Sequence, residues 1–169
     1  MVKRPGLSSE EELREFERLV REGFGGSDDG LPARIRRAHR LAIHRSSANE
    51  PIAIAGLKSP DEDYRSDLFE RSETAASATD YLLELGWVYV LPEHRGRRLG
   101  ERLCRRLVNE PPTGGLFATT RPDNEPMIRI LRALGFIRTG RPFCHPRRDE
   151  ELALFLRRQG ADEAAASLA

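Results

Sequence analysis

The chain has 169 residues, of which 38% are hydrophobic and 33% charged, and a formal net charge of +1. This length and composition suit one soluble domain with a single core, and the near-neutral charge gives no general case for nucleic acid or an anionic membrane as a partner. No run approaches the roughly 20 apolar residues that span a bilayer, and no apolar stretch of a secretory signal follows the basic start. Cys104 and Cys144 fit no metal-ligand spacing, so we expect a reduced, cytoplasmic protein without a metal.

The first half of the chain predicts a helix followed by a pair of strands. Ser9 and Glu12 have the spacing of a capping box, and apolar residues recur on one helical face as far as Phe24. Residues 25–30 predict a loop. Two β-like runs follow, joined by a polar segment of hairpin length, and the polar stretch 59–80 then predicts at most a short helix. The runs and the short helix are residues 40–44, 52–57 and 64–71.

From residue 81 onwards the pattern alternates between strands and helices. Residues 81–91 are the strongest predicted strand, apolar on both alternating faces, which indicates a central position covered on both sides. Pro92 ends this strand. Helical spacing of apolar residues begins at Leu99, and a second helix begins at Pro126, with Gly135 where a left-handed C-terminal cap belongs. Further strands are predicted at residues 116–120, 136–139 and 151–156.

This order of elements predicts an α/β or α+β class around one sheet. The sequence contains no internal repeat. We expect one domain over residues 1–158 and a flexible C-terminal tail over residues 159–169.

The most informative segment is residues 84–108, in which a buried strand leads through a turn rich in glycine and arginine into an amphipathic helix. Backbone N–H groups in such a turn converge on one point, and the helix dipole adds partial positive charge there. Gly96 and Gly100 allow a ligand to approach the backbone closely. The segment therefore predicts an anion site suited to a pyrophosphate.

These residues resemble a known family. Residues 90–100, VLPEHRGRRLG, are similar to the acetyl-CoA signature of the GNAT (Gcn5-related N-acetyltransferase) superfamily, (Gln/Arg)-x-x-Gly-x-(Gly/Ala). Arg95 and Gly100 match its ends, and Arg98 replaces the inner glycine at a position that works through its backbone N–H. Downstream, Asn124 and the Gly-Phe pair at 135–136 resemble the second signature, N-x(10)-G-F, so that the resemblance covers about residues 8–157.

The resemblance implies a fold and a cofactor. The fold would be α/β, a single domain with a mixed, mostly antiparallel central sheet flanked by helices. The acyl donor would be acetyl-CoA, held by backbone groups of the central strand along the pantetheine arm and by turn amides at the pyrophosphate. The implied cofactor-binding residues are Val88, Tyr89, Val90, Arg95, Gly96, Arg97, Arg98, Leu99, Gly100, Glu101 and Asn124.

The resemblance also implies an activity, the transfer of an acetyl group to a primary amine by direct attack, with the acceptor unidentified. Glu84 lies eleven residues before Arg95, where many members carry a general-base glutamate. Burial would favour its protonated form and suit it to accept a proton near neutral pH. The alternative role is a structural ion pair with an arginine, or a partly exposed strand start. Leu131 stands where many relatives carry a tyrosine acid, so we expect no dedicated acid, with Tyr81, Tyr89 and His145 as the replacements to test.

Several other interpretations remain open. The turn has the alternative of a plain connection with solvated arginines, and the chain has that of an acyl-CoA-binding regulatory module without turnover. The arginines of the following helix also suit nucleic acid, but acidic residues interrupt them and no aromatic residues alternate with them, which favours a cofactor phosphate. We expect acceptor recognition from residues 59–80 and 140–149. A homodimer is compatible with the resemblance. The arginines are Arg97, Arg98, Arg102, Arg105 and Arg106.

Overall fold

The computed structural model of the chain describes residues 1–25, 30–109, 114–145 and 150–158. Within these ranges the residues group into two compact units, one of residues 1–59 and 85–110 and one of residues 60–84 and 111–169. One strand, β4 (Tyr81–Val90), begins in the second unit and ends in the first. The predicted tail, residues 159–169, lies outside the described residues.

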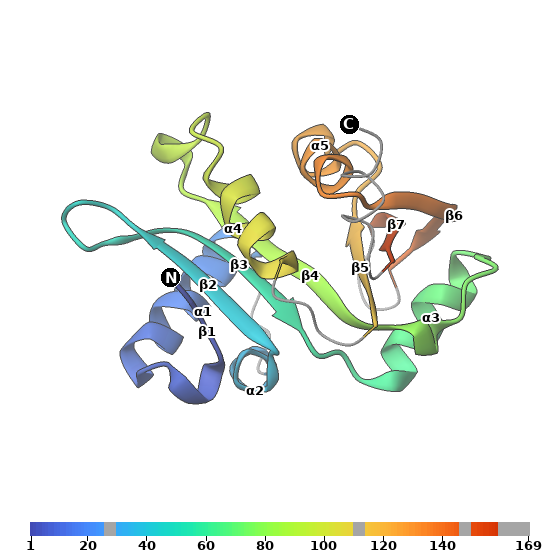
Figure 1. Cartoon of the computed structure of the whole chain (residues 1–169), viewed down its shortest axis with the longest axis horizontal. Coiled ribbons are helices and arrows are strands. Elements are labelled where there is room, and N and C mark those ends of the chain that lie inside the picture. The colour runs from blue at the N-terminus through green and yellow to red at the C-terminus, as the bar shows by residue number, and fades with distance from the viewer. Residues whose placement is uncertain (26–29, 110–113, 146–149, 159–169) are drawn as a thin grey trace. The chain divides into compact units, whose positions relative to one another are not determined.

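The first unit combines helices with antiparallel strands (Figure 1). The predicted hairpin is confirmed: β2 and β3 pair antiparallel, with Arg40 opposite Leu57 and His44 opposite Ala53. The short β1 pairs antiparallel with β2 on its other side. The elements are β1 (Val2–Lys3), the 3-10 turn η1 (Pro5–Leu7), α1 (Glu10–Phe24), α2 (Leu31–Arg37), β2 (Arg40–Arg45), β3 (Pro51–Lys58), the 3-10 turn η3 (Pro92–His94) and α4 (Leu99–Val108).

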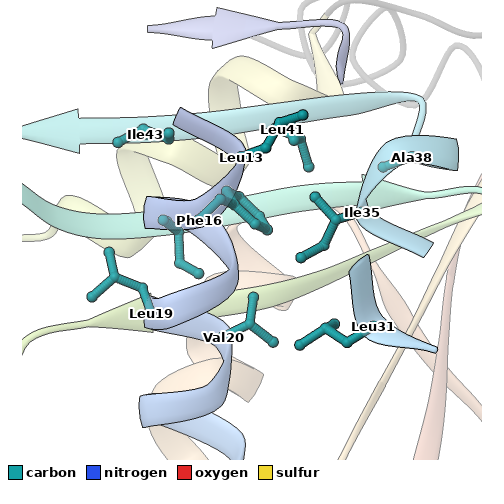
Figure 2. Close-up of a cluster of buried hydrophobic side chains, with 10 residues drawn as sticks. Leu13, Phe16, Leu19, Val20, Leu31, Ile35, Ala38, Leu41 and Ile43 are labelled. Carbon is teal, nitrogen blue, oxygen red and sulfur yellow. The ribbon is translucent and has the colours of Figure 1, made fainter. Parts of the chain in front are cut away.

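The helix α1 forms as its sequence predicts. The Ser9 hydroxyl accepts from the Glu12 N–H at 3.1 Å, and the Glu12 carboxylate accepts from the Ser9 N–H at 2.9 Å, which completes the capping box. Figure 2 shows the apolar face of α1 pointing toward side chains of α2 and β2. The cluster contains Leu13, Phe16, Leu19, Val20, Leu31, Ile35, Ala38, Leu41, Ile43 and Ile54.

The strands β2 and β3 are also covered on their other face. Leu41 and Ile43 belong to the α1 cluster, and the intervening Ala42 is fully buried. Because successive strand residues point to opposite faces, Ala42 faces away from α1. The helix α4 packs on both β2 and β3, and small residues such as Ala42 permit this close approach. The structure thereby holds α4, the helix predicted to bind the pyrophosphate, on a rigid support.

The second unit is built on β4, β5, β7 and β6. β4 pairs parallel with β5 through Tyr81, Leu83 and Glu84, and β7 pairs antiparallel with both β5 and β6. A cluster around Phe117 and Leu154 fills the space between these strands and α3. The elements are α3 (Glu62–Arg71), the 3-10 turn η2 (Ala78–Asp80), β5 (Gly115–Thr120), α5 (Glu125–Ala133), β6 (Ile137–Cys144) and β7 (Glu151–Arg157).

The predicted fold class is confirmed. The strands are hydrogen-bonded in the order β1-β2-β3-β4-β5-β7-β6, with β4 at the centre as its apolar pattern predicts, and β4–β5 is a parallel pair. Two expectations need correction. The helix α2 was not predicted, and β6 continues to Cys144 although residues 136–139 alone were predicted as a strand. In the described residues no helix is both long enough and apolar enough to cross a membrane.

Candidate active site

The turn between β4 and α4 has the backbone geometry of an open helix N-terminus. Gly96 has φ +76°, and a Cβ built there would meet nothing within 4 Å, so this position needs glycine for its conformation rather than for space. Arg98 is the N-cap of α4, with the left-handed values φ 56° and ψ 23°. An arginine adopts this conformation at a cost, and the family signature has glycine at the same place.

No side chain caps α4. The first backbone bond of the helix runs from the Arg102 N–H to the Arg98 carbonyl at 3.0 Å, and the Arg98 side chain accepts no backbone N–H. The N–H groups of residues 99–101 precede that bond, and none of them has a backbone acceptor among the described residues. Three amides that point out of a helix N-terminus fit the diphosphate of a coenzyme A thioester.

The charge around this N-terminus is positive. Arg97, Arg98 and Arg102 are exposed, as expected for the solvated face of the helix. Glu101 is half-buried and pairs with Arg98 at 3.2 Å and with Arg105 at 3.1 Å, so its carboxylate is balanced locally. A phosphate at the turn would therefore meet backbone dipoles and mobile guanidinium groups together.

The end of β4 is held against α1 in the first unit. Val88, Tyr89 and Val90, predicted to bind the pantetheine arm, are half-buried. The Tyr89 hydroxyl donates to Glu22 Oε1 at 3.1 Å, and burial with this bond raises the pKa of Tyr89 above its usual value. Arg95, the first residue of the signature, folds back on the strand, where its Nε donates to the Val90 carbonyl at 3.1 Å.

Glu84, the predicted base, lies in the second unit. Its side chain is only 2% exposed, which confirms that the strand buries a carboxylate and excludes the alternative of an exposed strand start. The Thr119 hydroxyl of β5 donates to Glu84 Oε1 at 3.2 Å. Since a carboxylate is stable in such a place only with hydrogen-bond partners, Thr119 fixes its position.

Asn124 also lies in the second unit, and its side chain is used locally. Its Oδ1 accepts from the Met127 N–H at 3.3 Å and so caps α5, and its Nδ2 donates to the Thr120 hydroxyl at 3.0 Å. Both polar atoms of the Asn124 side chain are therefore engaged within α5 and β5. Its predicted contact with the cofactor stays a prediction.

The residues considered as a proton donor or a nucleophile differ in how far their side chains are buried. Leu131, at the position of the usual tyrosine acid, is fully buried in α5 and has no proton to give. Cys104 is a core residue of α4, and burial raises the pKa of its thiol to about 12. Cys144 is exposed. No group of three His, Cys, Asp or Glu residues in the described part of the chain could hold a metal ion.

The two segments predicted to recognise the acceptor contact each other within the second unit. The rings of Tyr64 and His145 lie 6.3 Å apart, and the hydroxyls of Thr74 and Thr139 share a hydrogen bond of 2.9 Å. The Arg141 N–H donates to the Ser72 carbonyl at 2.8 Å. Residues 146–149, the rest of the second segment, lie outside the described residues.

The structure thus groups the predicted residues in two sets. The turn, α4 and the end of β4 belong to the first unit, while Glu84 and Asn124 belong to the second. Sequence analysis missed Thr119 and Thr120, although two hydroxyl residues at the end of an apolar strand were a usable signal. No pattern in the sequence indicates the left-handed backbone of Trp87, whose side chain is partly buried against the α1 cluster.

Solved structures of other proteins share this fold. A crystal structure of a GNAT-family acetyltransferase from Streptococcus agalactiae superposes with a TM-score of 0.66 at 17% identity, covering 94% of this chain and 95% of that one. A phosphinothricin acetyltransferase of the GNAT superfamily from Sinorhizobium meliloti, in complex with AcCoA, superposes with a TM-score of 0.67 at 18% identity, covering 94% and 87% of the two chains. At these identities the likeness shows the fold.

The sequence itself matches one curated protein over a short segment and one family model over most of the chain. An uncharacterized protein of Mycobacterium leprae, ML0378, is 38% identical over 64 residues, which are 37% of this chain and 18% of that protein's length. The model of the acetyltransferase (GNAT) family matches residues 9–136, a range that includes both signatures and most of the described elements. The chain belongs to the acetyltransferase (GNAT) family.

Proposed function

We propose that this chain is an N-acetyltransferase that transfers the acetyl group of acetyl-CoA to a primary amine by direct attack. The observation that carries this proposal is the uncapped N-terminus of α4, which follows the left-handed Arg98 and offers amides to a diphosphate. Family membership points to the same donor. In this scheme residues 95–101 hold the diphosphate, and backbone groups of Val88, Tyr89 and Val90 hold the pantetheine arm.

Glu84 would act as the general base. It would take a proton from the acceptor ammonium, directly or through water, so that the free amine nitrogen can attack the thioester carbonyl. The new C–N bond forms as the C–S bond breaks, the sulfur leaves with its electron pair, and the nitrogen releases its second proton to the departing thiolate or to water, which gives a neutral amide. An ordinary thiol has a pKa of about 8.5, so the thiolate can leave near neutral pH without a proton donor. This is consistent with the buried Leu131 at the place of the usual acid.

The experiment that tests the donor is calorimetric titration with acetyl-CoA. The experiment that tests the reaction is a screen of primary amines, with release of the free thiol as the readout. Saturable binding and turnover on at least one amine would support the proposal. Binding without turnover across a broad panel would favour an acyl-CoA-binding regulatory module instead, and absence of binding would reject both.

We also propose that α3 contributes to acceptor recognition. The exposed carboxylates of Glu62 and Asp63 lie in the first turn of α3, next to Tyr64 in the chain. They would attract a cationic or polar acceptor rather than an apolar one. Replacing each with alanine should raise KM for the acceptor and leave KM for acetyl-CoA unchanged. The reverse pattern would contradict this role.

A further inference from the structure

Trp87 has a backbone conformation that a large side chain rarely adopts. It lies inside β4, yet its φ is +51°, in the left-handed region. For a bulky residue this is a true outlier, and such strain persists only where the surroundings fix it. The contacts of Trp87 in the first unit therefore have a positional purpose that its hydrophobicity alone does not explain.

The indole of Trp87 lies directly on a glycine. A Cβ built at Gly56 of β3 would stand 2.8 Å from Cε3 of the indole, closer than real side chains come. The ring of Phe16 meets the indole edge to face, with centroids 5.8 Å apart, and the Lys58 ammonium lies 5.6 Å from its centroid. An aromatic ring, a cation and a missing side chain together hold the residue in its strained conformation.

Tyr89, two residues further along β4, repeats the arrangement. A Cβ at Gly23 of α1 would stand only 2.4 Å from Cδ2 of the phenol ring. The Tyr89 hydroxyl is bonded to Glu22, and the Arg95 guanidinium lies 5.9 Å from the centre of the ring. Through Arg95, this ring also connects the end of β4 with the start of the turn.

We propose that Trp87 and Tyr89, each seated on a glycine, are positioning residues for the acyl donor. This inference rests on the proposed function. The two rings flank Val88 and fix the backbone whose polar groups would bind the pantetheine arm. Their action is indirect, because the rings anchor the strand to β3 and α1 rather than supplying the contact. The two glycines are required for this packing, because any side chain at Gly56 or Gly23 would displace a ring.

The test adds one methyl group under each ring, in Gly56→Ala and Gly23→Ala. The matched control is Gly6→Ala, where a Cβ meets nothing within 4 Å. Trp87 is the only tryptophan, so the fluorescence emission of the protein and its quenching by acrylamide report directly on the packing of the indole against Gly56. Two ligands are titrated, acetyl-CoA and 3′-phospho-ADP, which carries the diphosphate but no pantetheine.

We expect Gly56→Ala to increase quenching of Trp87 and to weaken acetyl-CoA binding by at least tenfold, while 3′-phospho-ADP binding changes by less than threefold. Gly23→Ala should weaken acetyl-CoA binding as well, and its melting temperature should change little, because the helix preference of alanine offsets part of the cost of displacing the Tyr89 ring. A purely structural role would link lost binding to lost stability. Gly6→Ala should match the wild type in every readout.

If Gly56→Ala moves the indole but leaves acetyl-CoA affinity and kcat at wild-type values, the positioning role is wrong and the proposed function stands. If the wild type binds neither acetyl-CoA nor 3′-phospho-ADP, the proposed function fails, and the donor role of the pair fails with it. Should Gly56→Ala not fold, Lys58→Met tests the same seat, because it removes the cation and keeps the stem. The inference would then be overturned if Lys58→Met left both the quenching and the acetyl-CoA affinity unchanged and Gly23→Ala left the acetyl-CoA affinity unchanged.

Discussion

The N-termini of α4 and α5 both follow a strand and a short turn, yet only α5 has a side-chain cap for its first backbone N–H groups. At α5, the Asn124 side chain accepts a backbone N–H and is itself held by Thr120. At α4, the N-cap is a left-handed arginine whose side chain caps no N–H. The α5 N-terminus is capped by its own side chain, whereas the α4 N-terminus has no side-chain cap, and we propose that a ligand takes that place. A residue that matches a family signature, such as Asn124, can therefore have a structural role in the fold.

The charges at the two ends agree with this difference. The α4 end carries exposed Arg97 and Arg98, whereas the α5 end carries exposed Asp123 and Glu125. A helix dipole attracts anions at either N-terminus, but neighbouring carboxylates oppose that attraction at α5. We therefore expect the anion to bind at α4 rather than at α5, where the Asn124 cap is structural.

The largest effect should come from placing a negative charge in the α4 turn. Gly100→Glu adds bulk and charge where the diphosphate is expected, and we predict that it abolishes acetyl-CoA binding in calorimetry. The matched change at α5 is Pro126→Glu, which should leave the affinity unchanged. Because Gly100 is buried, circular dichroism must show a native-like fold before the loss is interpreted. Unchanged affinity in a folded Gly100→Glu protein would remove the diphosphate from this turn.

The next effect concerns chemistry rather than binding. Glu84→Gln keeps the shape and the hydrogen bond from Thr119 but cannot accept a proton, so kcat should fall by roughly 10²–10⁴-fold. The affinity for acetyl-CoA should barely change, since the turn lies elsewhere in the chain. Thr119→Val, which removes only the hydrogen bond to Glu84, should lower kcat by less. A Glu84→Gln enzyme with near wild-type kcat would make Glu84 a structural residue.

Local signals explain why most of the fold was predictable. The capping box at Ser9, the doubly apolar strand of β4 and Gly135 after α5 each depend on residues close in the chain. The Gly135 φ of +77° confirms the predicted cap. The helix α2 lacks such a signal, since its seven residues bury only Leu31 and Ile35, too few to show a period. In β6 only Phe143 is buried, and the register with β7 shifts between Thr139 and Phe143, so the second half of the strand shows no apolar alternation in the sequence.

The site was predictable only in part, because its geometry depends on residues distant in sequence. The turn was visible through its glycines and its place between a strand and a helix. The hydrogen bond between Thr119 and Glu84 joins residues 35 positions apart, and no local pattern indicates it. The left-handed Trp87 contacts Gly56 and Phe16, which are distant in sequence, so no local pattern indicates its conformation. The capping role of Asn124 could have been read, since asparagine commonly precedes a first helical turn with proline.

A smaller effect is expected for the candidate acids. Tyr89→Phe, Tyr81→Phe and His145→Ala should each lower kcat by no more than about tenfold, or roughly 1.4 kcal/mol. Burial and the bond to Glu22 raise the pKa of Tyr89, which makes its proton harder to release, and Tyr81 is a core residue. Phenylalanine also retains the Tyr89 ring on its glycine. A thousandfold loss in one folded variant would identify a dedicated acid.

The cap of α5 should contribute to stability and little to binding. Asn124→Ala removes the side-chain acceptor for the Met127 N–H and should cost about 1 kcal/mol. For a chain of this length, that corresponds to a melting temperature lower by about 2–4 °C. Asn124→Asp can still cap the helix and should restore most of the loss. If Asn124→Asp is stable but binds acetyl-CoA weakly, Asn124 contacts the cofactor as the family signature implies.

The smallest effect concerns the charge that surrounds α4. Burial lowers the pKa of His44 in β2 below its usual value, and the positive charges of Arg102, the amino terminus and Arg106 lower it further. The unfolded chain therefore binds more protons than the folded chain between the folded pKa of His44 and the ordinary histidine value of 6.5. The contribution of His44 to stability is fully present above pH 6.5 and is lost as the pH falls from there through the folded pKa.

This sign can be tested by NMR titration and by thermal unfolding at several pH values. His44→Gln should lose less stability than the wild type as the pH falls below 6.5, because glutamine binds no proton. Arg102→Gln should raise the pKa of His44, whereas Arg105→Gln, whose arginine pairs with Glu101, should leave it in place. A diphosphate bound at the α4 turn brings negative charge to the same helix, so acetyl-CoA should also raise the pKa of His44. An unchanged His44 titration at saturating acetyl-CoA would place the bound anion away from α4, and the contrast between the two helix ends would lose its electrostatic basis.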